Sequence, residues 1–124
     1  MPATPSLGKA QRGKRVRLAG SVLAVVLLES GRQIRARLNQ LSINGGLLSL
    51  DNPLDEGIRV TVIFHLGLTS IRGRAQMLFP MWATQGCLQP FRFLELSEES
   101  HGALNHELEG LVRAGAPQEE EESE

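Results

Sequence analysis

Hydrophobic and polar residues alternate along the middle of the chain with the period of two that is typical of half-buried β-strands. The clearest case is residues 32–38, where apolar side chains on one face alternate with arginines on the other. The same alternation recurs in residues 58–64 and 71–79, and the last of these runs places Phe79 on the inner face. Residues 18–28 form a Val- and Leu-rich run without a helix-capping residue, which favours a buried strand.

Segments rich in turn-forming residues separate these runs at the short spacing of an all-β barrel. They lie at residues 29–32, 51–57 and 80–86, and Gly67 marks a further turn. Residues 91–93 then begin a last strand with two phenylalanines on one face. The pattern predicts about six short strands.

The pattern changes at Ser97, where we expect a helix to begin. Serine is a favoured N-cap, and the acidic residues that follow it suit the positive end of a helix dipole. Arg113 and Gly115 are the corresponding signals for the helix end. Apolar residues recur at helical spacing between these limits and predict one amphipathic helix; they are Leu104, Leu108, Leu111 and Val112.

Composition adds the expected size and make-up of the core. The chain has 124 residues, enough for one domain, and its 41% hydrophobic and 4% aromatic content indicates a core of Leu, Val and Ile. We expect residues 12–113 to form a β-barrel with a C-terminal helix. Residues 1–11 are expected to be a flexible arm, and residues 114–124, which end in EEEESE, a disordered acidic tail.

Charge is distributed unevenly, although the formal net charge is only -1. Glu29 is the only acid among the many basic residues between positions 9 and 37, whereas Arg113 is the only Lys or Arg after Leu94. Such an asymmetry indicates a basic end that meets an anion and an acidic end that does not. The acidic tail could serve solubility, or it could occupy the basic arm in the free protein.

A single cysteine, Cys87, excludes an intrachain disulfide, fits a reducing compartment and is expected in the core. The apolar run at residues 18–28 is much shorter than the roughly 20 residues of a membrane helix. We therefore expect a cytoplasmic protein without stable membrane insertion, although an encounter with a bacterial inner membrane stays open. His65, His101 and His106 lack the spacing of paired helical metal ligands, so no metal site is predicted.

The segment QLSINGGLLSL, residues 40–50, places a polar cluster between two predicted strands. Asn-Gly is a strong hairpin signal, so the segment can be a simple turn. It can also hold a ligand, because the Ser42 hydroxyl can donate and accept, and Gly45 and Gly46 allow close backbone approach and positive φ. The residues alone leave both interpretations open.

With its neighbours this segment resembles part of the PilZ domain. The resemblance depends on a basic segment with paired arginines, a strand hairpin, LSINGGLLSL, PFRFLEL in the last strand and a helix. It covers residues 12–112 and implies a bacterial signalling domain with a six-stranded antiparallel β-barrel and a C-terminal helix. It also implies a ligand, because many PilZ domains bind cyclic di-GMP through two short motifs.

The first family motif, Arg-x-x-x-Arg, precedes the first strand and aligns with Gln11 and Arg15, so its first arginine is missing. Arg12, Lys14 or Arg17 could substitute for it. Arginine suits this ligand because its guanidinium pairs with phosphate, stacks on a purine and forks onto the purine's O6/N7 edge, whereas lysine is only a point charge.

The second motif, Asp or Asn, x, Ser, x, x, Gly, aligns with Gln40, Ser42 and Gly45, so its first position also departs from the family. Asn39 lies one residue too early, and a one-residue shift turns a strand side chain to the other face. A Gln lacks the charge of an Asp, which weakens binding by about 1 to 2 kcal/mol.

The resemblance implies a non-enzymatic receptor or adaptor that binds cyclic di-GMP and needs no other cofactor. In this hypothesis Arg12, Arg15 and Arg17 close over the nucleotide against residues 40–46, and the ordered arm signals to an unidentified protein partner. No catalytic motif is present and Ser42 has no neighbouring His, so no catalytic residue is predicted.

Two alternatives remain. One is a PilZ-like protein-interaction module that does not bind the nucleotide, which the substitutions at Gln11 and Gln40 would allow. Trp82 could serve such a module as an exposed anchor, or it could be a core residue. The lower alternative is a barrel for single-stranded nucleic acid, which usually needs aromatic platforms. Here Tyr is absent and the phenylalanines fall in apolar registers; they are Phe64, Phe79, Phe91 and Phe93.

Overall fold

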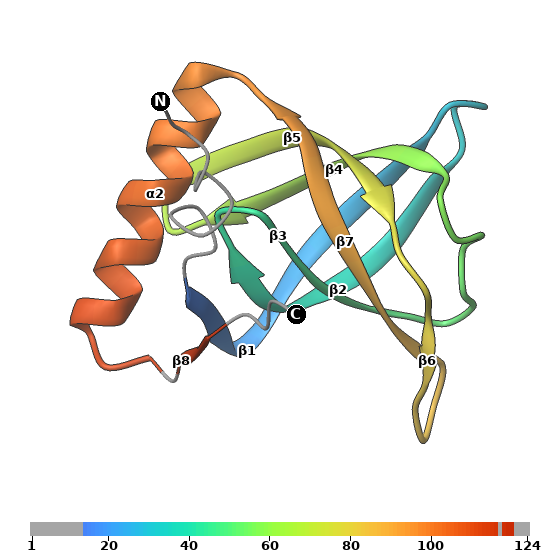
Figure 1. Ribbon diagram of the computed structural model, residues 1–124, viewed down its shortest axis with the longest axis horizontal. Coiled ribbons are helices and arrows are strands. Elements are labelled where there is room, and N and C mark those ends of the chain that lie inside the picture. Colours follow the sequence, from blue (N-terminus) through green and yellow to red (C-terminus); the bar gives the residue numbers. More distant parts are fainter. Residues whose placement is uncertain (1–13, 117, 121–124) are drawn as a thin grey trace, which may run out of the picture.

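The computed structural model describes residues 14–116 and 118–120. Six of its strands close into an antiparallel barrel in the order β1, β2, β3, β7, β5, β4 and back to β1, as Figure 1 shows. Two short strands lie outside this ring: β6 pairs with β7, and β8 pairs with β1. The barrel strands are β1 Lys14–Leu28, β2 Gln33–Ser42, β3 Gly45–Leu50, β4 Arg59–Leu66, β5 Thr69–Met77 and β7 Cys87–Leu96; β6 is Met81–Trp82 and β8 is Gln118–Glu120.

The barrel closes through β1, the longest strand, which has 15 residues. One edge of β1 pairs with β2, and the other edge pairs with β4 over residues 24–28. The pairing with β2 is irregular between Arg17 and Val22. Such an irregularity bends a strand and increases its twist, which helps a short sheet to close on itself.

The predicted alternation of apolar and polar residues is confirmed in the barrel wall. In β2, Ala36 and Leu38 are buried, whereas Arg35 and Arg37 are exposed. Burying a Val, Leu or Ile side chain contributes roughly 1.5 to 3 kcal/mol, so the filled interior is the main source of stability. The most deeply buried side chains come from every barrel strand and include Val16, Val26, Leu41, Leu48, Val62, Phe64, Ile71 and Met77.

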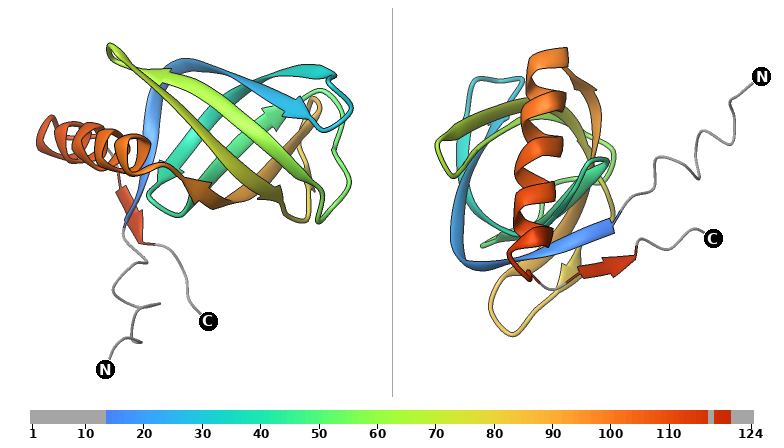
Figure 2. Two further views of the ribbon diagram at one scale, coloured as in Figure 1. Left: turned by 90° about the horizontal axis from the view of Figure 1, so that it is seen from above. Right: turned by 90° about the vertical axis from the view of Figure 1, so that its left-hand side faces the viewer.

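Helix α2, Glu98–Arg113, crosses one end of the barrel, as Figure 2 shows. The predicted N-cap is confirmed, because the Ser97 hydroxyl accepts a hydrogen bond from the Ser100 N–H at 3.0 Å. Leu104 and Leu108 are buried against the barrel interior. Val112 is 36% exposed, so the apolar face of the helix is narrower than its sequence indicates.

The start of the barrel differs from the sequence expectation. β1 begins at Lys14, whereas the sequence predicts a strand only from residue 18, so residues 14–17 of the basic segment are part of a strand. Arg15 and Arg17 are therefore fixed in the sheet rather than carried on a mobile segment. The predicted flexible arm, residues 1–11, and the predicted ligand residue Arg12 lie outside the described residues.

The prediction that Phe79 belongs to the core is wrong. β5 ends at Met77, and Phe79 is 68% exposed. Pro80 has no N–H with which to continue a strand ladder, and the chain turns outward to form the short pairing of β6 with β7. Trp82 is 78% exposed in β6, which makes it a surface residue rather than part of the core.

The acidic tail also differs from expectation at residues 118–120. We expected disorder, but these residues form β8 and pair antiparallel with the beginning of β1. The backbone register sets Glu119 opposite Arg15 and Glu120 opposite Lys14. An acidic segment therefore covers an edge of a basic strand, which would otherwise present unpaired backbone groups.

Gly45 and Gly46 let β3 lie close to its neighbours. A Cβ atom at Gly45 would collide with the carbonyl oxygen of Phe91 in β7, and one at Gly46 would stand 2.6 Å from the carbonyl oxygen of Gln40. Neither glycine has positive φ, so the expected role in positive-φ backbone is wrong. Their function in the fold is close packing of backbone against backbone.

Gln89 is a fully buried polar residue of β7 that the hydrophobic pattern does not reveal. Its side-chain oxygen accepts from the Leu54 N–H at 2.9 Å, and its Nε2 donates to the carbonyls of Leu54 and Leu78, both at 2.8 Å. These bonds connect the loop after β3 with the segment after β5. Buried backbone groups are costly to leave without partners, so Gln89 holds these two segments together.

Replacing Gln89→Leu should lower the free energy of unfolding by roughly 2 to 4 kcal/mol, because the backbone groups it satisfies would lose their partner. Urea unfolding measures the change. Gln33→Leu, at an exposed position of β2, is the matched control and should change stability by less than about 0.5 kcal/mol. Equal unfolding midpoints for the two variants would show that the hydrogen bonds of Gln89 do not stabilise the barrel.

Replacing Gly45→Ala should lower the free energy of unfolding by about 1 to 3 kcal/mol, because the added methyl meets backbone atoms that have little room to move. Gly102→Ala is the control, since a Cβ there meets nothing within 4 Å, and it should stabilise α2 by up to about 1 kcal/mol. If thermal denaturation shows both variants stabilised, the close packing of β3 on β7 is not a constraint.

Candidate functional site

An open depression lies on the outer wall of the barrel, where β1, β2, β3 and β7 are consecutive neighbours. Its volume is about 330 Å³, and its lining combines one arginine, two amides and three leucines: Arg17, Leu18, Asn39, Gln40, Leu47 and Leu88. The wall between it and the core is a single sheet, because the adjacent residues Val16, Leu41 and Leu48 point inward and are buried.

The strand register brings the basic segment and the Ser-Gly segment together. Arg17 pairs directly with Gln40 across β1 and β2, and Gln40 pairs with Leu47 across β2 and β3. Arg15 is half-buried and lies two residues before Arg17 on the same face of β1. Continued by two residues from Arg17 and Gln40, the same register leads from Arg15 to Ser42 at the end of β2.

The Ser42 hydroxyl is engaged in the turn that follows β2. Its Oγ accepts from the Asn44 N–H at 3.1 Å and donates to the Gly45 carbonyl at 3.4 Å, and the residue is fully buried. Ile43 and Asn44 form a two-residue turn between β2 and β3. Ser42 therefore shapes the hairpin, which is the purely structural interpretation that the sequence left open.

Asn39 occupies an unexpected position. We expected it on the opposite face from Gln40, but the ladder between β2 and β3 passes from the Leu38–Leu48 pair to the Gln40–Leu47 pair and leaves Asn39 as an extra residue. A bulge of this kind suspends the strict alternation of side chains. Asn39 and Gln40 consequently line the same depression, and both are partly exposed.

Neither amide, that of Asn39 or that of Gln40, is hydrogen-bonded to another residue in the part of the chain that the structure describes. Their oxygen and nitrogen atoms can therefore accept from and donate to a bound molecule. The sequence did not identify the leucines of the lining, because each lies in an apolar run that looks like core.

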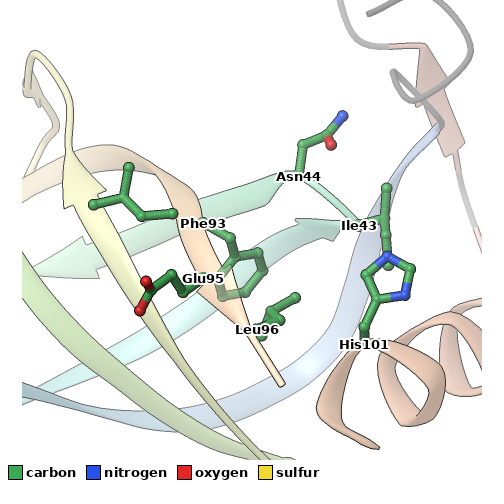
Figure 3. Close-up of a pocket in the computed structure, with 7 residues that line it drawn as sticks. Ile43, Asn44, Phe93, Glu95, Leu96 and His101 are labelled. Atoms are coloured by element: carbon green, nitrogen blue, oxygen red, sulfur yellow. The ribbon is translucent and has the colours of Figure 1, made fainter. Parts of the chain in front are cut away.

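A second depression, of about 390 Å³, lies at the barrel end beside α2, and Figure 3 shows how its residues meet. His101 from the helix lies near Ile43 of the β2–β3 turn, Asn44 of the same turn also lines the depression, and Phe93 and Glu95 come from β7. Its lining contains no Lys or Arg among the described residues. It is therefore less suited to a phosphate than the depression at Arg17.

The single cysteine lies in the core, as its sequence context predicts. Cys87 is buried, and desolvation raises the pKa of its thiol, which keeps it protonated at neutral pH. Among the residues that the structure describes, no group of three His, Cys, Asp or Glu side chains is placed to hold a metal ion. In the same part of the chain, no helix combines the length and the apolar character needed to cross a membrane.

Comparison with known proteins identifies the architecture. No model of a protein family matches the chain, and no curated protein matches it in sequence. Its fold is similar to Escherichia coli YcgR in complex with c-di-GMP, with a TM-score of 0.71 and 24% identity over 81% of this chain and 45% of that chain. The isolated PilZ domain of YcgR with c-di-GMP gives a TM-score of 0.63 and 23% identity, over 81% of this chain and 89% of the domain.

A third similar structure is the Bacillus subtilis inhibitor of motility, MotI/DgrA, with a TM-score of 0.67 and 14% identity over 82% of this chain and 52% of that chain. The chain thus spans about half the length of the two longer proteins and nearly all of the isolated domain. Their shared part is a barrel of the kind described above. The chain has the fold of the PilZ domain.

Proposed function

We propose that this chain is a non-enzymatic receptor for cyclic di-GMP that passes the signal to a protein partner. The observation that carries the proposal is the direct pairing of Arg17 with Gln40 in an open depression on the barrel wall. Structural neighbours solved with c-di-GMP support the choice of ligand.

The residues of the depression suit the chemistry of a cyclic dinucleotide. The Arg17 guanidinium can form charged hydrogen bonds with a phosphate or a planar contact with a guanine. Leu47 and Leu88 give an apolar floor on which a purine can lie. Arg15, two residues away on the same strand face, supplies a second cation for the doubly anionic ligand.

The sequence predicts that three arginines close over the nucleotide. For the two arginines that the structure describes, we propose a different mechanism. Arg15 and Arg17 are already held in β1 before any ligand is bound. Preorganised groups lose less conformational entropy on binding than groups on a mobile segment. Ordering of the arm on binding would then concern only residues before Lys14, including the proposed ligand residue Arg12.

The exposed apolar residues near β6 support a contact with a protein partner. Phe79 is 68%, Met81 48% and Trp82 78% exposed, and all three lie within four residues of sequence. Met81 pairs with Leu88, which lines the depression. Aromatic and Met side chains are enriched at the centres of protein interfaces, so this surface suits a partner that senses the nearby ligand.

One observation favours the alternative of a protein-interaction module that does not bind nucleotide. The Ser42 hydroxyl, which the family resemblance assigns to the ligand, is fully buried and bonded within the turn. If the turn keeps this hydroxyl, the dinucleotide has one polar contact fewer. Binding would then depend on the arginines and on the two amides of β2.

Titration calorimetry with cyclic di-GMP should detect binding, and Arg17→Ala should weaken it by about 10-fold to 100-fold, the usual contribution of hydrogen bonds from a charged group. Arg72→Ala is the matched control, because Arg72 is exposed on β5, which does not border the depression. The affinity of the Arg72→Ala variant for cyclic di-GMP should equal that of the unaltered protein.

The absence of any heat up to millimolar nucleotide would exclude the receptor and leave the interaction module. Equal losses in both arginine variants would show that the nucleotide responds only to overall charge. Circular dichroism of each variant verifies that the barrel is intact.

A further inference from the structure

We infer that Asn39, rather than the motif-aligned Gln40, reads the edge of a guanine in the depression. This inference rests on the proposed function and names a residue that determines its specificity. It comes from the irregular ladder between β2 and β3, which the sequence does not display.

The first step is geometric. In a regular strand Asn39 and Gln40 would face opposite sides of the wall, and one of the two amides would enter the core on the side of the buried Leu38 or Leu41. The bulge removes Asn39 from the pairing with β3 and brings it to the lining that contains Arg17. An amide in the apolar core would need buried partners, so the outward position is also the favourable one for Asn39.

The second step concerns the length of the side chain. The resemblance assigns Asp or Asn to the first motif position, and Asn39 has that side-chain length, whereas Gln40 is longer by one methylene. A shorter side chain has one rotatable bond fewer to fix when it binds, so it loses less entropy. The bulge therefore gives the chain a side chain of the expected length in the depression, one residue earlier in sequence.

The third step concerns complementarity. An Asn amide offers an oxygen that accepts and a nitrogen that donates. Guanine presents N–H donors next to its O6 acceptor, so one planar amide can match both, and the Arg17 guanidinium can contact the N7 edge or a phosphate. Adenine carries an N–H donor where guanine carries O6, so the same contacts would not form.

The test measures the affinities of Asn39→Ala and Gln40→Ala for cyclic di-GMP and for cyclic di-AMP. We expect Asn39→Ala to lose about 10-fold in cyclic di-GMP affinity and most of the preference over cyclic di-AMP. Gln40→Ala, one residue away, should weaken both dinucleotides to a similar and smaller extent and keep that preference. A role of Asn39 in folding alone would weaken both ligands equally, which separates structure from recognition.

A gain-of-affinity pair makes the comparison independent of weak initial binding. Asn39→Asp should tighten cyclic di-GMP by about 10-fold, since a carboxylate accepts from guanine with full charge, and Gln40→Asp should tighten it less than about 2-fold. The opposite order assigns the role to Gln40 and overturns the inference while the receptor stands. If the unaltered chain and both Asp variants bind nothing at millimolar nucleotide, the receptor and the inference both fail.

Discussion

The pairing of β1 with β2 is the constraint on which the rest of the structure depends. This pairing completes the ring of six barrel strands. The same pairing places Arg17 opposite Gln40. Because the strands alternate, fixing the buried partners Val16 and Leu41 also fixes the outward partners on either side. Closure of the barrel and assembly of the depression are therefore one event, and a slip of one residue would disrupt both.

Much of the architecture could be predicted because it depends on periodicity. The apolar face of β2, the Ser97 cap and the buried Leu104 and Leu108 all follow from spacing along the chain, and the structure confirms them. The end of β5 was missed because Phe79 continues the alternation in sequence while Pro80 cannot continue the ladder. A period of two describes side chains only as long as backbone pairing persists.

The candidate site was less predictable, because it depends on departures from periodicity. The bulge at Asn39 is a feature of the pairing between β2 and β3, and no residue type near it in the sequence predicts it. The early start of β1 has a similar cause, since its first residues gain pairing from β8 at the other end of the chain. The sequence does not predict the role of Gln89, because its partners are backbone groups of Leu54 and Leu78, which lie elsewhere in the sequence.

The structure also gives a second explanation for Ser42 and Gly45, the two residues that match the second motif. Ser42 bonds to both sides of its own turn, and Gly45 leaves room for the backbone of Phe91, so the fold requires both residues whether or not a nucleotide binds. Their presence therefore argues for the barrel and only weakly for the ligand. The case for binding rests on residues outside the core and the turn, namely the outward Arg17 and the amides of Asn39 and Gln40, which make no side-chain hydrogen bond within the described part of the chain. A side chain that neither fills the core nor completes a turn, yet faces a depression beside a cation, is explained more simply by recognition than by stability.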